Sequence, residues 1–163
     1  MKEINFLKKL KREGKIELVK PSEEMKLSYL IKSENCLKSS KILFQNQLYE
    51  NSISESYYCM YNSLLALLFK LGIKSENHSA SIILFRKLFN NPDLVKIISW
   101  AKEERIDKQY YVETKQIIKV TKESCNEMIL KGENFLIKMK VFISELKNEE
   151  TNSIKENFNK LLS

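Results

Sequence analysis

The pattern of apolar and polar residues along the chain predicts a series of helices. Apolar side chains recur at steps of three, four and seven residues, the spacing that places them on one face of a helix. The predicted helices cover residues 22–47, 50–71, 74–89, a shorter segment from 92, and 121–146. A short amphipathic helix before Gly14 and a weaker one at 149–163 flank them, and 14–21 and 110–120 are predicted to be extended connectors.

Turn and cap residues at the segment boundaries support these limits. Hydroxyl and amide side chains cap helix N-termini, while glycine ends helices in the left-handed conformation. The expected N-caps are Ser22, either Ser75 or Asn77, Asn91 with Pro92 behind it, and Thr121, and the expected helix end is Gly72.

Small and apolar residues along the long helices predict how they pack. Leu27, Leu30, Leu37 and Phe44 mark the expected inner face of the first long helix. The same face carries Ser33 and Ser40, and the last long helix carries Gly132, all small enough to let a neighbouring helix approach closely. Residues 59–71 are apolar nearly all round, which predicts the central, most buried helix.

Composition agrees with an all-α protein. Three glycines and two prolines in 163 residues are too few for the turns of a sheet protein. We therefore predict an up-down bundle of four to five helices at 22–148, with a basic N-terminal arm and connector at 1–21 and an amphipathic helix at 149–163. Three scattered cysteines and the lack of a long apolar stretch favour a cytoplasmic protein without a membrane segment.

Charge points to acidic or phosphate-bearing partners. The net charge is +7, and residues 1–20 hold seven Lys and Arg against three Glu. Such a surplus favours nucleic acid or another anion as a partner. A solvated basic arm without a partner explains the charge alone equally well.

His78 is the only histidine and follows Glu76 and Asn77 at the predicted start of a helix. A helix N-terminus can bind an anion, although a lone histidine more often has a structural role. A di-iron site in a bundle needs two Glu-x-x-His pairs, so one histidine excludes it. We expect neither a metal nor another cofactor.

A second group of candidates lies at residues 103–113, EERIDKQYYVE, which combines Arg105 with Asp107, Gln109, Tyr110 and Tyr111. Arginine is well suited to bind a phosphate or a developing oxyanion. The alternative is a surface ion pair beside two tyrosines that cover the core. Tyr57, Tyr58 and Tyr61 form a third group, interpreted as core aromatics with hydrogen-bonded hydroxyls, and the nearby Asn62 needs a polar partner.

The order and spacing of these segments resemble a small, stand-alone HEPN domain. The resemblance rests on three stretches: PSEEMKLSYLIKSENCLKSSKILFQNQLYENSISESYYCMYNSLLALLFKLGIKSENHSASI, ERIDKQYYV and GENFLIKMKVFI. It implies a helical bundle that forms a homodimer. It also implies a metal-independent RNase, often a toxin paired with a minimal nucleotidyltransferase (MNT) antitoxin.

The family's catalytic motif is an arginine followed a few residues later by a histidine, with two copies meeting across the dimer. Arg105 matches the arginine by position, but the residue five places on is Tyr110. We expect Arg105, His78 and Tyr110 to act in catalysis, with Asp107, Gln109, Tyr111, Asn77 and Glu76 in binding. The alternatives are a non-catalytic HEPN module that binds a nucleotidyltransferase or a nucleotide, and a plain helical scaffold.

Overall fold

The structure, a computed structural model, describes residues 2–109 and 120–163, without the side chains of 106–109. Its elements are α1 (Lys2–Arg12), β1 (Ile16–Leu18), α2 (Glu23–Gln45), α3 (Tyr49–Leu71), β2 (Ile73–Ser75), α4 (His78–Leu88), α5 (Pro92–Gln109), α6 (Lys122–Glu145) and α7 (Asn148–Leu162).

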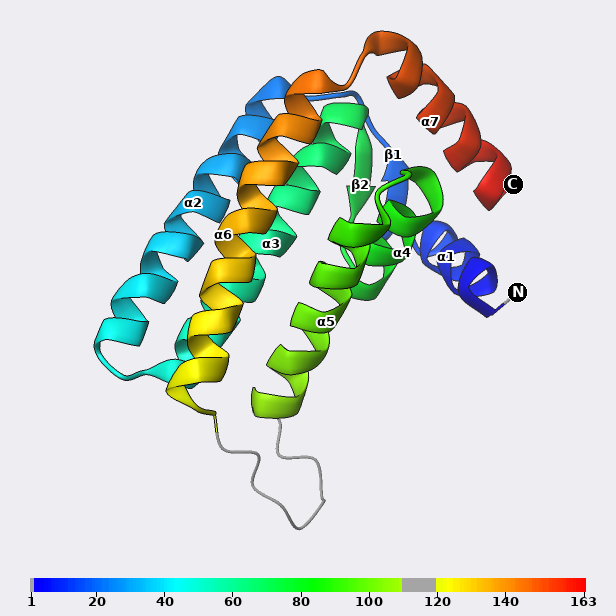
Figure 1. The fold of residues 1–163 in the computed structure, drawn as a ribbon. Coiled ribbons are helices and arrows are strands. Elements are labelled where there is room, and N and C mark those ends of the chain that lie inside the picture. Colours follow the sequence, from blue (N-terminus) through cyan, green and yellow to red (C-terminus); the bar gives the residue numbers. More distant parts are fainter. Residues whose placement is uncertain (1, 110–119) are drawn as a thin grey trace.

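Four long helices, α2, α3, α5 and α6, form the predicted up-down bundle (Figure 1). Successive long helices run in opposite directions, and α3 packs against the other three. Its second half is buried on nearly every side, as its uniformly apolar sequence predicts. The short α4 lies beside α5 and links the bundle to α1 and α7.

The predicted caps define the helix boundaries. Ser22 accepts a hydrogen bond from the Met25 amide, and Thr121 accepts one from Ser124. Of the two candidates for α4, Asn77 is the cap, because Ser75 belongs to β2. The prediction for α2 was two residues too long, since Gln47 has a positive φ of 60° that cannot continue a helix.

Small residues bring α3 close to α2 and α6, as expected. Ser33 and Ser40 are fully buried on α2; Ser33 Oγ donates to the Cys59 carbonyl at 2.5 Å, and the Ser40 carbonyl accepts from Ser52 Oγ at 2.7 Å. At Gly132 an added Cβ would lie 3.3 Å from the Ser56 carbonyl oxygen. Close packing at these residues sets the spacing of the three helices.

Leu27 and Asn62 test two further predictions, one about the inner face of α2 and one about a polar partner inside α3. Leu27 was expected on the inner face of α2, but its side chain is 52% exposed, so that prediction was wrong. The packing of α2 is centred on its serines, which leaves Leu27 at the edge. The Asn62 amide finds its polar partner in Cys36, donating to Sγ at 3.6 Å.

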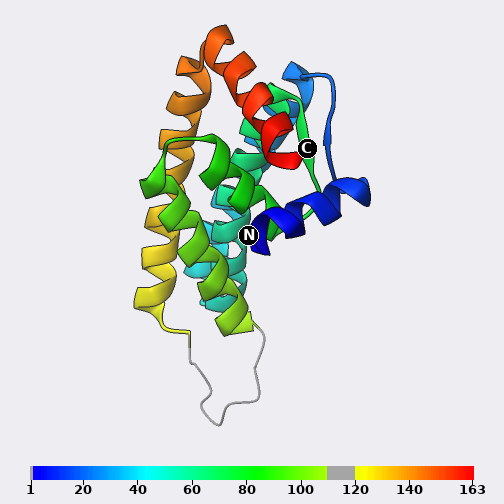
Figure 2. The same ribbon diagram turned by 90° about the vertical axis from the view of Figure 1, so that its right-hand side faces the viewer.

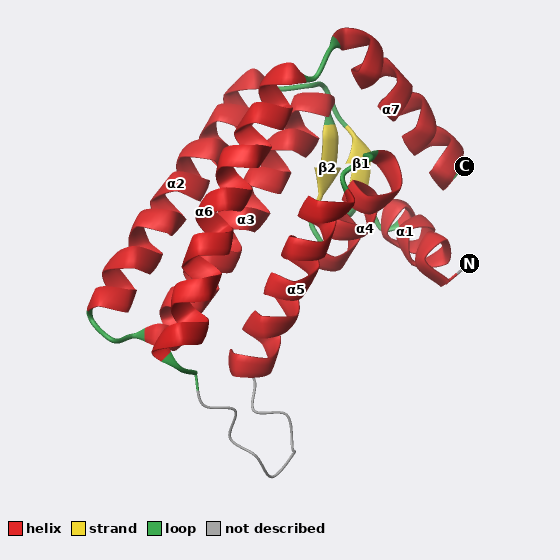
Figure 3. Ribbon diagram, in the orientation of Figure 1, coloured by secondary structure: helices red, strands yellow, loops and turns green. Residues whose placement is uncertain are grey.

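A two-stranded antiparallel sheet, absent from the all-helical prediction, connects the N-terminal arm to the bundle (Figure 3). β1 lies in the segment predicted only as an extended connector, and Ile16 pairs with Ser75 of β2. Ile16 and Ile73 are fully buried, so the sheet contributes to the core. Gly72 makes this pairing possible, because its φ of 72° ends α3 and turns the chain into β2.

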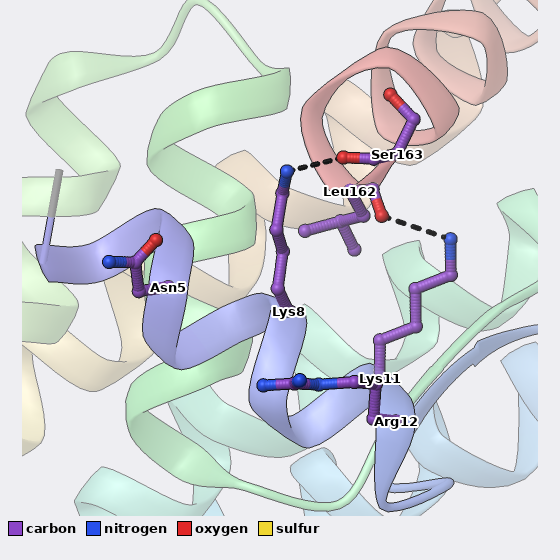
Figure 4. Close-up of a pocket in the computed structure, with 6 residues that line it drawn as sticks. All are labelled: Asn5, Lys8, Lys11, Arg12, Leu162 and Ser163. Carbon is purple, nitrogen blue, oxygen red and sulfur yellow. Dashed lines mark hydrogen bonds between the residues drawn. The ribbon is translucent and has the colours of Figure 1, made fainter.

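The two terminal helices lie together on one side of the bundle (Figure 2). α7 buries Ile154, Phe158 and Leu162. Lys8 and Lys11 of α1 donate hydrogen bonds to the carbonyls of Ser163 and Leu162, beside a cavity of about 560 Å³ (Figure 4). Cations at a helix C-terminus satisfy unpaired carbonyls and interact favourably with the helix dipole. Part of the basic arm therefore has a structural role.

The remaining expectations concern the membrane and the cysteines. In the described part of the chain, no helix is both long and apolar enough to cross a bilayer. Cys59 and Cys125 are buried and Cys36 is half-buried, all as free thiols. Burial raises the pKa of Cys59 to about 11 and that of Cys36 to about 12, so both remain protonated near neutral pH.

Candidate functional site

Three helices bring an arginine, a histidine and a set of tyrosines into one cluster. α3 carries Tyr57, Tyr58 and Tyr61, α4 begins with His78, and α5 carries Arg105 in its last two turns. Positions 57, 58 and 61 of a helix face the same side closely enough to contact both neighbours. We define these five residues as the tyrosine–arginine cluster.

Arg105 is held against the tyrosine rings of α3. Its Nη2 donates to the Tyr58 hydroxyl at 3.1 Å, and its guanidinium carbon lies 5.4 Å from the Tyr57 ring centroid and 5.0 Å from that of Tyr58. Its Nε is buried without a hydrogen-bond acceptor in the described part of the chain. The electron-rich ring faces offset this lost hydrogen bond in part by cation–π attraction. The guanidinium is therefore fixed in place by neutral groups.

His78 is joined to the same tyrosines. Its Nδ1 lies 2.7 Å from the Tyr57 hydroxyl oxygen, and its ring stacks on Tyr61 with centroids 3.8 Å apart and planes 12° apart. Burial, followed by the nearby charges of Arg105 and Lys102, lowers the pKa of His78 below its ordinary value of 6.5. The imidazole is therefore neutral at pH 7.

Lys102 adds a second cation at the start of α4. Its Nζ donates to Ser79 Oγ at 2.6 Å, a neutral partner like that of Arg105. Asn77 caps the helix there, accepting from the Ala80 amide at 3.0 Å. Because a helix N-terminus carries partial positive charge, it adds to the positive potential of the two side chains. The edge of the cluster at His78 and Ser79 is thus suited to an anion.

A second layer of hydroxyls supports the cluster. Tyr61 shares a hydrogen bond of 3.3 Å with Ser81, whose hydroxyl donates to Ser75 of β2 at 2.8 Å. Burial raises the pKa of both Tyr57 and Tyr61, so neither phenol ionises near neutral pH. The expected hydrogen-bonded core tyrosines are present, and they also line the candidate site.

The sequence-predicted residues separate into distinct environments. The structure brings Arg105 and His78 together through Tyr57, and it places Asn77 beside them as a helix cap. Glu76 instead forms an ion pair with Lys74, with Oε1 2.9 Å from Nζ. For the other candidates, the side chains of Asp107 and Gln109 and the whole of Tyr110 and Tyr111 lie outside the described residues.

Sequence reasoning missed Lys102 and Ser79 as members of the site. Lys102 precedes Arg105 by three residues, a spacing that places both on one face of a helix. That signal was available from the sequence, whereas the contact with Ser79 depends on how α4 and α5 pack. Across the described residues, no three His, Cys, Asp or Glu side chains are grouped as metal ligands.

Comparisons with known proteins agree on one family. The model of the HEPN domain matches residues 27–142. A protein of Methanocaldococcus jannaschii, named as a putative toxin, is 28% identical over 129 residues, covering 76% of this chain and 92% of that protein. A UPF0332 protein of Thermotoga maritima is 25% identical over 121 residues, covering 71% of this chain and 89% of that protein.

A solved structure shows the same fold. The crystal structure of an archaeal HEPN homologue superposes with a TM-score of 0.59 at 21% sequence identity, covering 72% of this chain and 97% of that one. At this identity the likeness concerns the fold alone. The matched residues 27–142 include every member of the tyrosine–arginine cluster.

Proposed function

Because the chain belongs to the HEPN family, we propose that it is a toxin-like HEPN protein that acts on RNA at the tyrosine–arginine cluster. The observation that carries this proposal is the pairing of Arg105 and Lys102 with neutral hydroxyl partners beside a helix N-terminus. Because neither cation is paired with a carboxylate in these contacts, the positive charge of both remains available to an anionic ligand. A phosphodiester is the anion that fits such a group best.

The chemistry we propose is metal-independent cleavage of RNA. Arg105 binds the phosphate and stabilises the negative charge that develops when the RNA 2′-oxygen attacks phosphorus. The P–O5′ bond breaks and leaves a 2′,3′-cyclic phosphate and a 5′-hydroxyl, with the 2′-hydroxyl proton released to water and the 5′-oxygen protonated from water. Lys102 and the α4 N-terminus add positive potential at the same edge. No histidine lies downstream of Arg105, so the imidazole of the proposed site comes from His78.

A homodimer with a composite site is also part of this proposal. We expect an isologous homodimer in which two Arg105 side chains face one cleft, so that a composite site binds one RNA phosphate. Two like charges at 4 Å repel by about 1 kcal/mol in bulk water and by more when desolvated, a cost that the phosphate offsets. Light scattering at micromolar concentration should report a dimer, and a monomer would contradict the composite site.

A partner protein is also part of the proposal. Relatives from Methanocaldococcus jannaschii are named as putative toxins, and a toxin needs an antitoxin. We propose that this chain likewise has an antitoxin, and that the antitoxin is a minimal nucleotidyltransferase. Co-expression with such a protein followed by size exclusion should yield a stable complex.

RNA cleavage tests the proposed function directly. Purified protein should cut a mixed RNA pool in the presence of EDTA. Arg105→Ala should lower the rate by about 10²–10³-fold, the loss typical when one group that stabilises a developing oxyanion is removed. Lys38→Ala, an exposed lysine on α2, serves as the matched control and should cut at the wild-type rate. Equal cleavage by all three proteins would refute the site.

The second candidate is a non-catalytic HEPN module that binds a nucleotidyltransferase or a nucleotide. The observation that favours it is the residue five places after Arg105, which is Tyr110 instead of the family's histidine. His78 comes from a different helix, so it does not restore that spacing. Complex formation with the nucleotidyltransferase, together with no RNA cleavage under any condition, would favour this candidate.

A further inference from the structure

The hydrogen bond between Tyr57 and His78 determines which nitrogen of the imidazole carries the proton. Tyr57 is fully buried, and in the described part of the chain its hydroxyl has one hydrogen-bond partner, Nδ1 of His78 at 2.7 Å. If Nδ1 carried the proton and donated it, the hydroxyl hydrogen of Tyr57 would be buried without an acceptor. An unpaired buried donor bears the full penalty of desolvation, so the arrangement in which Tyr57 donates is the stable one.

Ionisation of Tyr57 does not remove the need for an acceptor of its hydroxyl hydrogen. Burial raises the pKa of its phenol, and Arg105 offsets that effect only in part. The Tyr57 oxygen therefore keeps its hydrogen at neutral pH. A neutral imidazole that accepts at Nδ1 must carry its own proton on Nε2.

We infer that Tyr57 is a positioning residue that donates to Nδ1 of His78 and holds the imidazole as the Nε2–H tautomer, so that His78 donates a hydrogen bond to an RNA phosphate oxygen. This inference rests on the proposed function and gives His78 a specific part in it. A histidine that acts as general base through Nε2 needs the opposite tautomer, with Nδ1–H donating to its partner.

The described side chains that contact His78 or shift its pKa are aromatic rings and cations, and none is a carboxylate. From α3, Tyr61 stacks on the His78 ring, and Tyr58 lies edge-on with centroids 6.1 Å apart. From α5, the cations Arg105 and Lys102 lower the pKa of His78 after the larger effect of burial. An imidazolium would need Nδ1–H as well, and the Tyr57 hydroxyl would then have to turn away. A neutral imidazole that donates through Nε2 therefore suits a site that already holds two cations.

Nitrogen NMR of the imidazole tests the inference, because His78 is the only histidine in the chain. In protein labelled with ¹⁵N-histidine at pH 7.5, the wild type should show a protonated Nε2 and a hydrogen-bonded, unprotonated Nδ1. Tyr57→Phe should shift the Nδ1 resonance toward that of a free imidazole and raise the pKa of His78. Tyr61→Phe is the matched control, since its hydroxyl bonds to Ser81, and it should leave the tautomer unchanged.

The outcomes separate this inference from the proposed function. A wild-type spectrum with the proton on Nδ1 would overturn the tautomer assignment, even if Tyr57→Phe did not fold. Addition of a 2′-O-methyl RNA oligonucleotide, which cannot be cleaved, should shift Nε2 and its proton while Nδ1 stays nearly constant. If the free protein has the expected tautomer but RNA changes neither nitrogen, the donor role and the RNA site fail together. The positioning of the ring by Tyr57 would remain.

Discussion

Replacement of Gly72 by alanine should destabilise the protein far more than the same change at Gly14. Both glycines have left-handed backbones, with φ of 72° and 70°. An L-residue in this conformation costs about 1–2 kcal/mol. Only Gly72 is also crowded, since an added Cβ would lie 2.3 Å from the Val19 carbonyl oxygen, whereas at Gly14 it would meet nothing within 4 Å.

The expected difference in the free energy of unfolding between the two variants follows from the crowding at Gly72. The Val19 amide donates to the Gly72 carbonyl at 2.8 Å, so this connector cannot move away without breaking its contact with the end of α3. Overpacking of this kind typically costs about 1–3 kcal/mol, which we expect for Gly72→Ala beyond the loss in Gly14→Ala. The entropy that alanine removes from the unfolded chain is common to both variants and cancels.

Thermal unfolding followed by circular dichroism measures this difference. In a chain of this size each 1 kcal/mol shifts Tm by about 2–4 °C, so Gly72→Ala should melt about 2–12 °C below Gly14→Ala. Equal Tm values for the two variants would refute the reasoning. They would show that the connector does not cross the end of α3, and that Gly72 is needed for its backbone conformation alone.

Two further changes address the histidine and the tail helix. Because the pKa of His78 is lowered in the folded state, its contribution to stability is complete above the unfolded value of about 6.5 and is lost as pH falls below that value. The free energy of unfolding, measured by urea titration, should therefore differ less between wild type and His78→Gln at pH 5.5 than at pH 7.5. A difference that does not change with pH would contradict this. Phe158→Ala should cost about 3–5 kcal/mol, because this α7 side chain is 1% exposed. A loss below about 1 kcal/mol by chemical denaturation would show that α7 is not packed on the core.

Helix boundaries and close helix contacts could be predicted from the sequence because their causes are local. A cap such as Thr121 acts within one turn, and a glycine such as Gly72 marks a helix end by its own conformation. Ser33 and Ser40 identified the contact of α2 with α3 because small residues at helical spacing indicate close approach. The prediction that Leu27 lies on the inner face was wrong, because hydrophobicity alone does not show where a helix face ends.

The sheet and the candidate site depend on tertiary placement, which local patterns do not contain. β1 and β2 span three residues each, too few for an alternating pattern, and they pair across more than fifty residues of sequence. Arg105 and His78 were candidates from their residue types, but their connection through Tyr57 depends on the packing of three helices. Tyr57 itself looked like an ordinary core aromatic, and its bond to His78 could not be read from its position in α3.

The salt dependence of RNA binding tests most directly whether Arg105 and Lys102 bind phosphate. Affinity for a 2′-O-methyl RNA oligonucleotide should fall as salt rises, and each lost phosphate contact should reduce the slope of log K against log salt by about 0.7. Arg105→Ala and Lys102→Ala should each show that reduction, whereas Lys38→Ala on α2 should keep the wild-type slope. A wild-type slope and affinity in both cluster variants would contradict the assignment of the tyrosine–arginine cluster as the RNA site.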